Sequence, residues 1–501
     1  MNSHQAHQLR ARNIGIDTYR ENIVYMRADC HICKSEGFTA LTRVVVHYDG
    51  RSIVATLNVV HSELLLHGDA GLSMEAMKRL EVKEGDCLSF SHLKHISSLG
   101  QVRAKMYHKE LTEEAFNAII TDIVAGRYSN IELAAFISAC SGNNLSLNEI
   151  IGLTKAMINT GQKIKWDNTM VFDKHCVGGL PGNRTTPIVV SIVAAAGLII
   201  PKTSSRAITS PAGTADTMET MAPVNLGLAE IKQVVEKDNG CIVWGGAVKL
   251  SPADDILISV EKSLDVDSEG QMIASVLSKK VAAGATHVVI DIPVGETAKV
   301  RSGKAAKMLK AYFEAVGKVI GLQVKVILTD GSQPVGKGIG PSLEAMDVLS
   351  VLRNEKNAPQ DLKERAIVLA GTLLELSGTF AAGTGNEAAK EILETGKAGA
   401  KFLAICESQG GFREPRFAKY SHDVLSEKEG VIKNIDNRGL ARVAKLAGAP
   451  KLPSAGILFL SPLRKKVSKG EVLYTIYAEA KGELEYAINY MKDNTNIIII
   501  E

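Results

Sequence analysis

Two segments of the sequence gather the ammonium, guanidinium and hydroxyl groups that proteins use to hold an anion. Residues 173–186 (DKHCVGGLPGNRTT) contain three glycines and two threonines ahead of an apolar run. Residues 202–216 (KTSSRAITSPAGTAD) contain six hydroxyl side chains, a lysine and an arginine. Glycines let the backbone approach a ligand, and the N–H groups that open a helix favour negative charge. We therefore expect a phosphate or sugar site anchored by Lys174, Ser204, Arg206 and Thr214.

Each segment alone also fits a structural role, as a glycine-rich turn or a solvated loop with a helix cap. The repetition of donors, each time after a β-like run, favours a ligand site. Neither segment contains the GxxxxGK[ST] pattern of a Walker loop. Two further stretches carry weaker signals. Ser275, Ser278 and Lys279 share one side of a helix, and the glycine-rich residues 330–341 follow another β-like run.

The β-like runs that precede these loops alternate with helical stretches from about residue 169 onward. They lie at 170–172, 198–200, 241–244, 287–290 and 324–328. Such alternation is typical of a parallel α/β sheet, in which ligands bind beyond the carboxyl ends of the strands.

The remaining sequence predicts further domains around this sheet. Residues 42–57 read as a hairpin about Asp49-Gly50, and capping boxes at Ser129 and Ser146 open two of three short helices. The predicted fold class is α/β multidomain. Its parts are an N-terminal β-rich domain (1–98), a helical domain that also receives later helices (99–165), an α/β phosphate-binding domain (166–420) and a C-terminal α+β domain (421–501).

Composition narrows the class of protein. The sequence has 58 basic and 55 acidic residues, a net charge of +3. This balance lacks the excess of positive charge that would indicate binding to nucleic acid or an anionic membrane. The sequence has seven cysteines, and it shows neither the apolar core of a signal peptide nor an apolar run long enough to span a bilayer. These features predict a cytoplasmic localisation. The single CxxC at Cys30 and Cys33 has no second pair, which favours buried thiols on a strand over a metal site.

Three ordered motifs resemble the thymidine and pyrimidine-nucleoside phosphorylase family. They are Lys174-His175-x-x-Gly178-Gly179, Ser204-x-Arg206 through Ala212-Gly213-Thr214-x-Asp216-x-x-Glu219, and Ala274-Ser275-x-x-Ser278-Lys279-Lys280. The resemblance runs from about residue 100 to the end. The N-terminal β domain and residues 205–210 resemble the long (type 2) branch, which includes AMP phosphorylases and long-chain proteins named as thymidine phosphorylases. The family implies the nucleoside phosphorylase type II fold, a cleft that closes on substrate, and a homodimer or larger homo-oligomer.

The resemblance also implies roles for individual residues. Positions that hold phosphate in thymidine phosphorylases match Lys174, Thr186, Ser204 and Thr214, and positions that face the base match His175, Ser275 and Lys279. Nucleotide-binding positions of AMP phosphorylases match Gly179, Ser205, Arg206, Thr209, Ser210, Thr214, Ser275 and Lys299. Asp267 matches their proton donor. His175 is the rival acid, because the reference pKa of histidine lies near neutrality.

These roles imply phosphorolysis of an N-glycosidic bond, in which thymidine and phosphate give thymine and 2-deoxyribose 1-phosphate. The alternative is an AMP phosphorylase, which gives free base and ribose 1,5-bisphosphate. Inorganic phosphate is the co-substrate, and the reaction needs no redox cofactor and no metal.

The sequence departs from the short thymidine branch at three positions. Cys176 stands where a phosphate-binding serine is usual, Ser210 where a histidine is usual, and Asp254 where an arginine contacts the pyrimidine carbonyl. These changes weaken the expectation of strict pyrimidine preference and keep the AMP alternative open. Two other hypotheses remain: a non-catalytic binding protein, and a phosphoribosyltransferase, which would usually hold magnesium through acidic residues.

Overall fold

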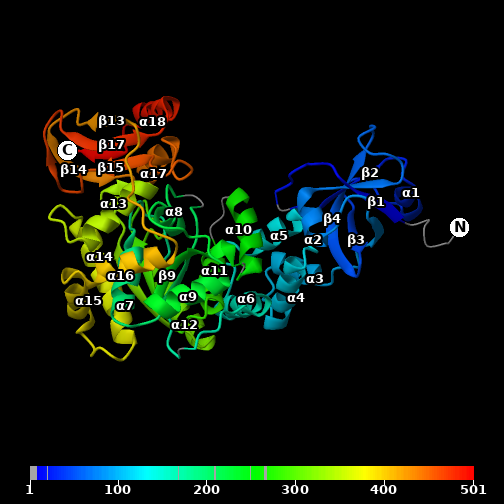
Figure 1. Ribbon diagram of the computed structural model, residues 1–501, viewed down its shortest axis with the longest axis horizontal. Coiled ribbons are helices and arrows are strands. Elements are labelled where there is room, and N and C mark those ends of the chain that lie inside the picture. Colours follow the sequence, from blue (N-terminus) through cyan, green and yellow to red (C-terminus); the bar gives the residue numbers. More distant parts are fainter. Residues whose placement is uncertain (1–7, 20, 168, 208–209, 249, 265–267) are drawn as a thin grey trace. The chain divides into compact units, whose positions relative to one another are not determined.

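The computed structural model describes residues 8–19, 21–167, 169–207, 210–248, 250–264 and 268–501 (Figure 1). The chain divides into two compact units. One comprises Met1–Cys140 with Ile256–Val266, and the other comprises Ser141–Asp255 with Asp267–Glu501. Within the described ranges, every helix is too short or too polar to cross a membrane.

A closed six-stranded barrel forms the first part of the chain, in the order β1-β5-β2-β4-β3-β6. Its strands are β1 (Gln8–Asn13), β2 (Ile23–Arg27), β3 (Arg43–Tyr48), β4 (Arg51–Val60), β5 (Asp69–Leu72) and β6 (Cys87–His92). The barrel closes because β6 pairs with both β1 and β3. The predicted hairpin is confirmed: β3 and β4 pair antiparallel, and Asp49 and Gly50 take φ values of 43° and 74° at the turn.

Short helices accompany the barrel in the same unit. They are α1 (His31–Glu36), α2 (Met74–Leu80), α3 (Leu99–Met106), α4 (Glu113–Val124) and α5 (Asn130–Cys140). The expected capping box before α5 is present, because Ser129 and Glu132 bond each other's backbone N–H groups. Placing Cys30 and Cys33 on a strand was wrong: both thiols are buried, but Cys30 caps α1 and Cys33 lies inside it.

The parallel strands of the second unit are β7 (Phe172–Cys176), β8 (Ile200–Ser204), β9 (Gly240–Trp244), β10 (His287–Val294) and β11 (Gln323–Asp330). They form a three-stranded sheet, β11-β10-β7, and a two-stranded sheet, β8-β9, rather than the single sheet expected. The sheets adjoin, since the Phe172 N–H donates to Ile199 O at 2.8 Å. Two strand predictions were wrong in position: β7 contains Lys174 and His175, and β8 contains Lys202 to Ser204.

Further helices lie before, between and after these strands in the chain. They are α6 (Leu147–Thr160), α7 (Thr185–Ala195), α8 (Thr214–Glu219), α9 (Leu228–Asp238), α10 (Pro252–Leu264), α11 (Glu269–Ala282), α12 (Gly303–Val319), α13 (Pro341–Leu352), α14 (Gln360–Leu376), α15 (Gly385–Glu394) and α16 (Lys397–Ser408), with a 3-10 turn at Gly245–Ala247. In one of them, α10, the residues from Ile256 onward belong to the first unit. The capping box that opens α6 is formed by Ser146 and Glu149, as expected. All residues of α7 from Thr185 to Ala194 are buried, so this helix forms the centre of the core. That core fixes the loop that leads into α7.

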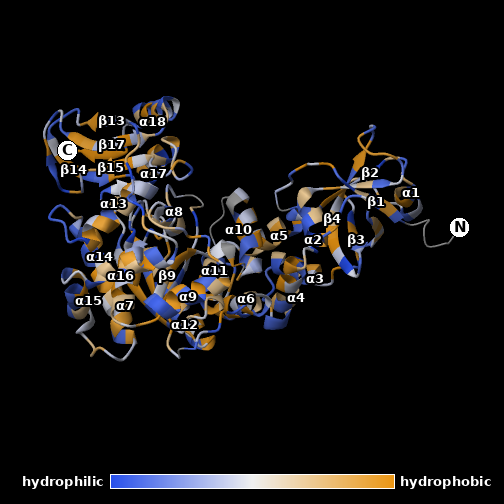
Figure 2. Ribbon diagram, in the orientation of Figure 1, coloured by the Kyte–Doolittle hydropathy of each residue, from blue (hydrophilic) through white to orange (hydrophobic). Residues whose placement is uncertain are grey.

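The C-terminal part of this unit is the predicted α+β fold. One antiparallel sheet has the order β12-β15-β17-β13 and the other has the order β16-β14-β18. The strands are β12 (Gly338–Ile339), β13 (Tyr420–Leu425), β14 (Gly430–Ile435), β15 (Gly456–Phe459), β16 (Lys466–Val467), β17 (Val472–Ala478) and β18 (Ile498–Ile500), with helices α17 (Asn437–Leu446) and α18 (Lys481–Asp493). Strands β15 and β17 are strongly apolar (Figure 2) and supply much of a separate hydrophobic cluster.

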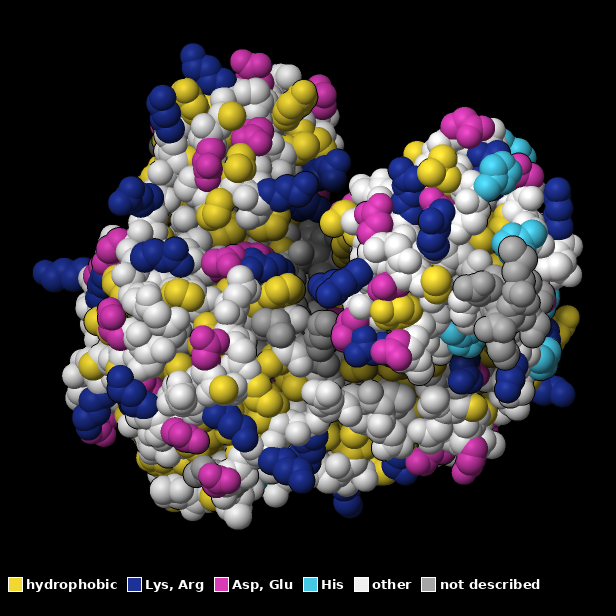
Figure 3. Space-filling view, turned by 45° about the vertical axis from the view of Figure 1, so that its right-hand side comes forward, with side chains coloured by type: hydrophobic (Ala, Val, Ile, Leu, Met, Phe, Trp, Pro, Cys, Tyr) yellow, Lys and Arg dark blue, Asp and Glu magenta, His cyan; other side chains and the backbone are white. Residues whose placement is uncertain are grey.

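The surface carries charges of both signs. In the face shown in Figure 3, lysine and arginine side chains are interspersed with aspartate and glutamate. This distribution agrees with the small net charge of +3.

Candidate active site

Two loops begin where β7 and β8 end, and each leads into a helix. Residues 177–184, the first loop, lead into α7, and residues 205–213, the second loop, lead into α8. Gly182 in the first loop has a φ of 69°, and a Cβ there would lie 2.2 Å from Val335 O. A Cβ on Gly213 would lie 2.5 Å from Ala207 N. Both positions therefore require glycine.

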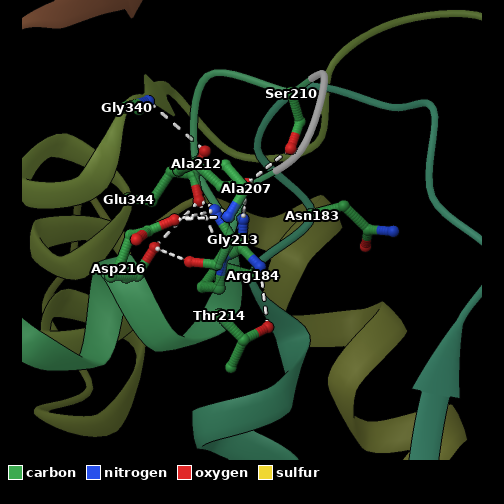
Figure 4. A network of polar contacts seen from close by, with 12 residues as sticks. Asn183, Arg184, Ala207, Ser210, Ala212, Gly213, Thr214, Asp216, Gly340 and Glu344 are labelled. Atoms are coloured by element: carbon green, nitrogen blue, oxygen red, sulfur yellow. Dashed lines mark hydrogen bonds and ion pairs between the residues drawn. The ribbon is translucent and has the colours of Figure 1, made fainter. Parts of the chain in front are cut away.

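Arg184 joins the two loops (Figure 4). Its Nη1 donates to Thr214 Oγ1 at 2.8 Å, and its Nη2 donates to Ala212 O at 3.0 Å. The guanidinium is held from the opposite side by Glu344, whose Oε2 lies 2.7 Å from Nε and 2.6 Å from Nη2. The segments that the sequence marked as anion loops therefore lie against each other.

Glu344 is a buried carboxyl group on the first turn of α13. Burial raises its pKa to about 7, although Arg184 acts to lower that pKa. Thr217 Oγ1 and Gly340 N also donate to this carboxyl group, at 3.2 and 3.3 Å. The Glu344 carboxyl group that binds Arg184 is therefore itself held in place by Thr217 and by the backbone of Gly340.

Strands β7 and β8 contribute a buried lysine and a buried hydroxyl group. Lys174 is buried in β7 and its Nζ donates to Thr185 Oγ1 at 2.6 Å, with Thr186 Oγ1 at 3.5 Å. Ser204, at the end of β8, is also buried, and its Oγ has no hydrogen-bond partner among the described residues. A buried hydroxyl without a partner is unfavourable unless a ligand satisfies it.

The second loop is braced by the carboxylates of α8. Asp216 Oδ2 accepts from Ala207 N at 2.7 Å and from Gly213 N at 2.9 Å. Arg206 binds both oxygens of Glu219, at 2.5 and 2.9 Å, and lies 5.0 Å from the centre of the Trp244 ring. Its charge is therefore engaged by carboxylates, so its contacts brace the loop rather than present an open guanidinium to an anion.

A buried charge cluster links β7, β8 and α11. Asp173 Oδ1 is 3.3 Å from Lys202 Nζ, and Asp173 Oδ2 is 2.8 Å from Lys280 Nζ. Burial alone would raise the pKa of Asp173, but the two ammonium groups outweigh it and lower that pKa. Burial chiefly lowers the pKa of Lys280 to about 7. Below that pH, two ammonium groups face one carboxylate and leave one surplus positive charge in the cluster.

Burial and the lysines of this cluster act on His175, which shares a strand face with Asp173. Burial first, and then the ammonium groups of Lys280, Lys202 and other lysines, lower the pKa of His175 well below its usual value. At neutral pH the imidazole is therefore neutral.

The expected base-contacting helix, α11, brings Lys279 to Asp254. Their Nζ and Oδ2 atoms lie 2.9 Å apart, and Asp254 is buried. Ser275 lies one turn earlier on the partly exposed side of α11, whereas Ser278 is buried and bonds to Ser275 O at 3.3 Å.

Cys176 lies at the end of β7 in a polar setting. Asn183 Nδ2 donates to its Sγ at 3.4 Å and to Asp291 Oδ2 at 3.2 Å. Burial raises the pKa of Cys176 to about 12, so this side chain is a neutral thiol at physiological pH.

The structure locates most of the expected residues around the two loops. Ser205 is exposed on the second loop and Ser210 bonds to Ala212 O at 2.9 Å. The backbone of Lys299 packs against Gly179, where an added Cβ would lie 2.5 Å from Lys299 N. Thr209 and Asp267 lie outside the described residues.

Sequence reasoning missed four residues, namely Arg184, Glu344, Asp173 and Lys202. Asp173 and Arg184 lie within residues 173–186, and Lys202 is the first of residues 202–216. Their positions in these two segments were the only sequence feature that could have indicated a role. Nothing local marked Glu344, because it lies 160 residues from Arg184 in the chain. No cluster of three or more potential metal ligands occurs in the described ranges.

Family comparisons agree with this architecture. Residues 101–161 match the helical bundle domain of a glycosyl transferase family, and residues 168–399 match its a/b domain. Residues 431–498 match a pyrimidine nucleoside phosphorylase C-terminal domain.

Relatives extend over the full length. A protein of Legionella pneumophila (strain Corby) named "Putative thymidine phosphorylase" is 58% identical and covers 100% of this chain and 97% of its own. A protein of the same name from Hahella chejuensis is 54% identical and covers 100% of this chain and 99% of its own.

A solved structure shares the fold at low identity. The crystal structure of anthranilate phosphoribosyltransferase from Thermus thermophilus has a TM-score of 0.52 and 18% identity, covering 62% of this chain and 98% of its own. That likeness concerns the fold alone. With the motifs, the three matched domains and the full-length relatives, the chain belongs to the thymidine and pyrimidine-nucleoside phosphorylase family and is a pentosyltransferase.

Proposed function

We propose that this enzyme cleaves the N-glycosidic bond of a nucleoside with inorganic phosphate, as a thymidine phosphorylase does. One observation carries the proposal: Arg184 ties the first loop to Ala212 and Thr214 of the second segment. This contact, with the unpartnered Ser204 hydroxyl at the end of β8, supports assigning Thr214 and Ser204 to one phosphate site. The names of the full-length relatives support the same substrate class.

The chemistry explains why such a site is needed. Phosphate is a weak nucleophile, and the sugar carbon develops positive charge as the base departs. A phosphate dianion held against that carbon stabilises the charge. Fixing phosphate and sugar together removes orientational entropy and supplies up to about 7–11 kcal/mol. Lys174, Thr186, Ser204 and Thr214 are the proposed phosphate ligands.

The departing base also needs a proton or a strong hydrogen bond. The lowered pKa of His175 disfavours an imidazolium donor at neutral pH. We therefore propose that Asp267 supplies the proton, and that neutral His175, Ser275 and Lys279 bind the base. Proton donation in the transition state is worth about 10²–10⁴ in rate.

The test is a phosphorolysis assay on purified protein. Thymidine, uridine, AMP, CMP and UMP are incubated with and without phosphate, and free base is measured by chromatography. Phosphate-dependent release of thymine supports the proposal. Release of base from none of them would contradict it and favour a binding protein.

A nucleoside 5′-monophosphate is the second candidate substrate. The observation that favours it is the contact between Gly179 and the Lys299 backbone, which brings the positions expected to bind a nucleotide to the first loop. Exposed Ser205 on the second loop adds a hydroxyl there. Base release from monophosphates alone, with ribose 1,5-bisphosphate as co-product, would establish this activity and contradict the thymidine assignment.

The resemblance also implies an assembly. We expect a cytoplasmic homodimer or larger homo-oligomer. Light scattering after size-exclusion chromatography checks this expectation, and a mass of 53.7 kDa, that of one chain, would contradict it.

A further inference from the structure

Arg184 is a cation at the junction of the two loops whose three side-chain nitrogens all have protein partners. Nε and Nη2 contact Glu344, Nη2 also contacts Ala212 O, and Nη1 contacts Thr214 Oγ1. Its side chain is only 12% exposed. A guanidinium held in this way acts mainly through the groups that it orients.

Thr214 is the group that it orients toward a ligand. A hydroxyl has one hydrogen to donate and lone pairs that accept. Thr214 Oγ1 accepts from Arg184 at 2.8 Å, and no acceptor for the Thr214 hydrogen occurs among the described residues. Phosphate oxygens accept hydrogen bonds, so a hydroxyl fixed as a donor suits them. The positive charge of Arg184 strengthens that donor.

We propose that Arg184 is a positioning residue for phosphate, which locks the two loops together and fixes the Thr214 hydroxyl as a hydrogen-bond donor to the anion. The inference rests on the proposed phosphorolysis, because it assigns a role within that same site. A lysine could not replace Arg184 fully, since one ammonium group lacks the planar fork that reaches Thr214, Ala212 and Glu344 together.

The test is a double-mutant cycle measured on phosphate. We expect Arg184→Ala and Thr214→Val each to raise KM for phosphate about 10- to 100-fold, the value of a charge-assisted hydrogen bond. KM for the nucleoside should change less than about threefold, because the base and sugar contacts remain. If Arg184 acts through Thr214, the double variant should be no worse than Thr214→Val alone. Thr214→Ser keeps the hydroxyl and should stay within about threefold of the unmodified enzyme.

Arg353→Ala is the matched control. Arg353 also pairs with a glutamate, Glu414, in the same unit but at an exposed position, and its removal should leave KM for phosphate unchanged. Arg184→Lys provides a second variant if Arg184→Ala unfolds, and should weaken phosphate binding to an intermediate degree. Circular dichroism establishes that each variant is folded.

Two failures are distinguishable. If the unmodified enzyme binds phosphate by calorimetry but releases no base from any substrate, the proposed function is wrong. The double-mutant cycle is then measured on the calorimetric dissociation constants for phosphate instead of KM. If the effects of the single variants add in the double variant, or if nucleoside KM rises as much as phosphate KM, Arg184 does not position Thr214 and the inference is overturned.

Discussion

The buried cluster of Asp173, Lys202 and Lys280 allows a stability prediction that depends on counting charges. Asp173 lies 3.3 Å from one ammonium group and 2.8 Å from the other. At these separations the two attractions are about 5 and about 6 kcal/mol for an effective dielectric constant of about 20. Replacing Asp173 with asparagine leaves two buried cations without a counter-charge. We expect this change to lower the free energy of unfolding by about 3–5 kcal/mol.

The lysine variants provide the contrast. Lys202→Met or Lys280→Met removes the surplus charge and leaves a one-to-one ion pair. Each should cost clearly less than Asp173→Asn, because the remaining carboxylate and ammonium group still compensate each other. The Lys202→Met/Lys280→Met double variant isolates the carboxylate and should again cost about 3–5 kcal/mol.

Urea unfolding at pH 6, below the pKa of about 7 for Lys280 so that both lysines are charged, followed by tryptophan fluorescence, is the assay. The chain has two tryptophans, and both report on the second unit. Trp166 Nε1 donates to Ala283 O at 2.8 Å beside the end of α11, and Trp244 lies in β9 next to β8. If Lys280→Met is as destabilising as Asp173→Asn, the balance of charges does not determine the stability of this cluster, and the prediction is wrong.

The pH dependence has a defined sign. Burial chiefly lowers the pKa of Lys280 to about 7, against about 10.4 in an unfolded chain. Between these values the unfolded state binds more protons, so stability contributed at this site rises with pH from about 7 upward. The Lys280→Met variant should lose that rise between pH 7 and 9, and an unchanged slope would exclude Lys280 as its source.

Three further predictions concern the loops. Ser204→Ala should raise KM for phosphate about tenfold with little change in melting temperature, and an unchanged KM would remove Ser204 from the phosphate site. Gly182→Ala should destabilise the unit more than Gly197→Ala. Both glycines have positive φ, but only a Cβ on Gly182 would lie 2.2 Å from a backbone oxygen. Equal melting temperatures of the two variants would contradict this prediction. Arg206→Gln should lower the melting temperature but leave KM for phosphate within about threefold, because carboxylates already engage its charge; a tenfold rise would make Arg206 a phosphate ligand.

Local features of the fold could be predicted from the sequence because their causes are local. The turn at Asp49-Gly50 and the capping box at Ser146 and Glu149 depend on residues a few positions apart. The two strands β7 and β8 were misplaced for the opposite reason. Their charged residues indicated loops, but Asp173 and Lys202 neutralise each other inside adjacent sheets.

In the candidate site, too, local features could be predicted from the sequence, whereas contacts between distant segments could not. The sequence showed two stretches rich in donors and predicted that they meet, and the structure places them in contact through Arg184. It could not show that Glu344 anchors this arginine, because that contact forms only when distant segments pack. Arg206 was an expected anchor, yet Glu219 of the same motif engages it, a pairing that the spacing alone does not specify.

The most direct measurement is a crystal structure of the enzyme soaked with tungstate, an electron-dense stand-in for phosphate. We expect one anion within hydrogen-bonding distance of Thr214 Oγ1 and Ser204 Oγ, between the loops that follow β7 and β8. An anion bound elsewhere, with those two hydroxyl groups left unoccupied at saturating tungstate, would contradict it.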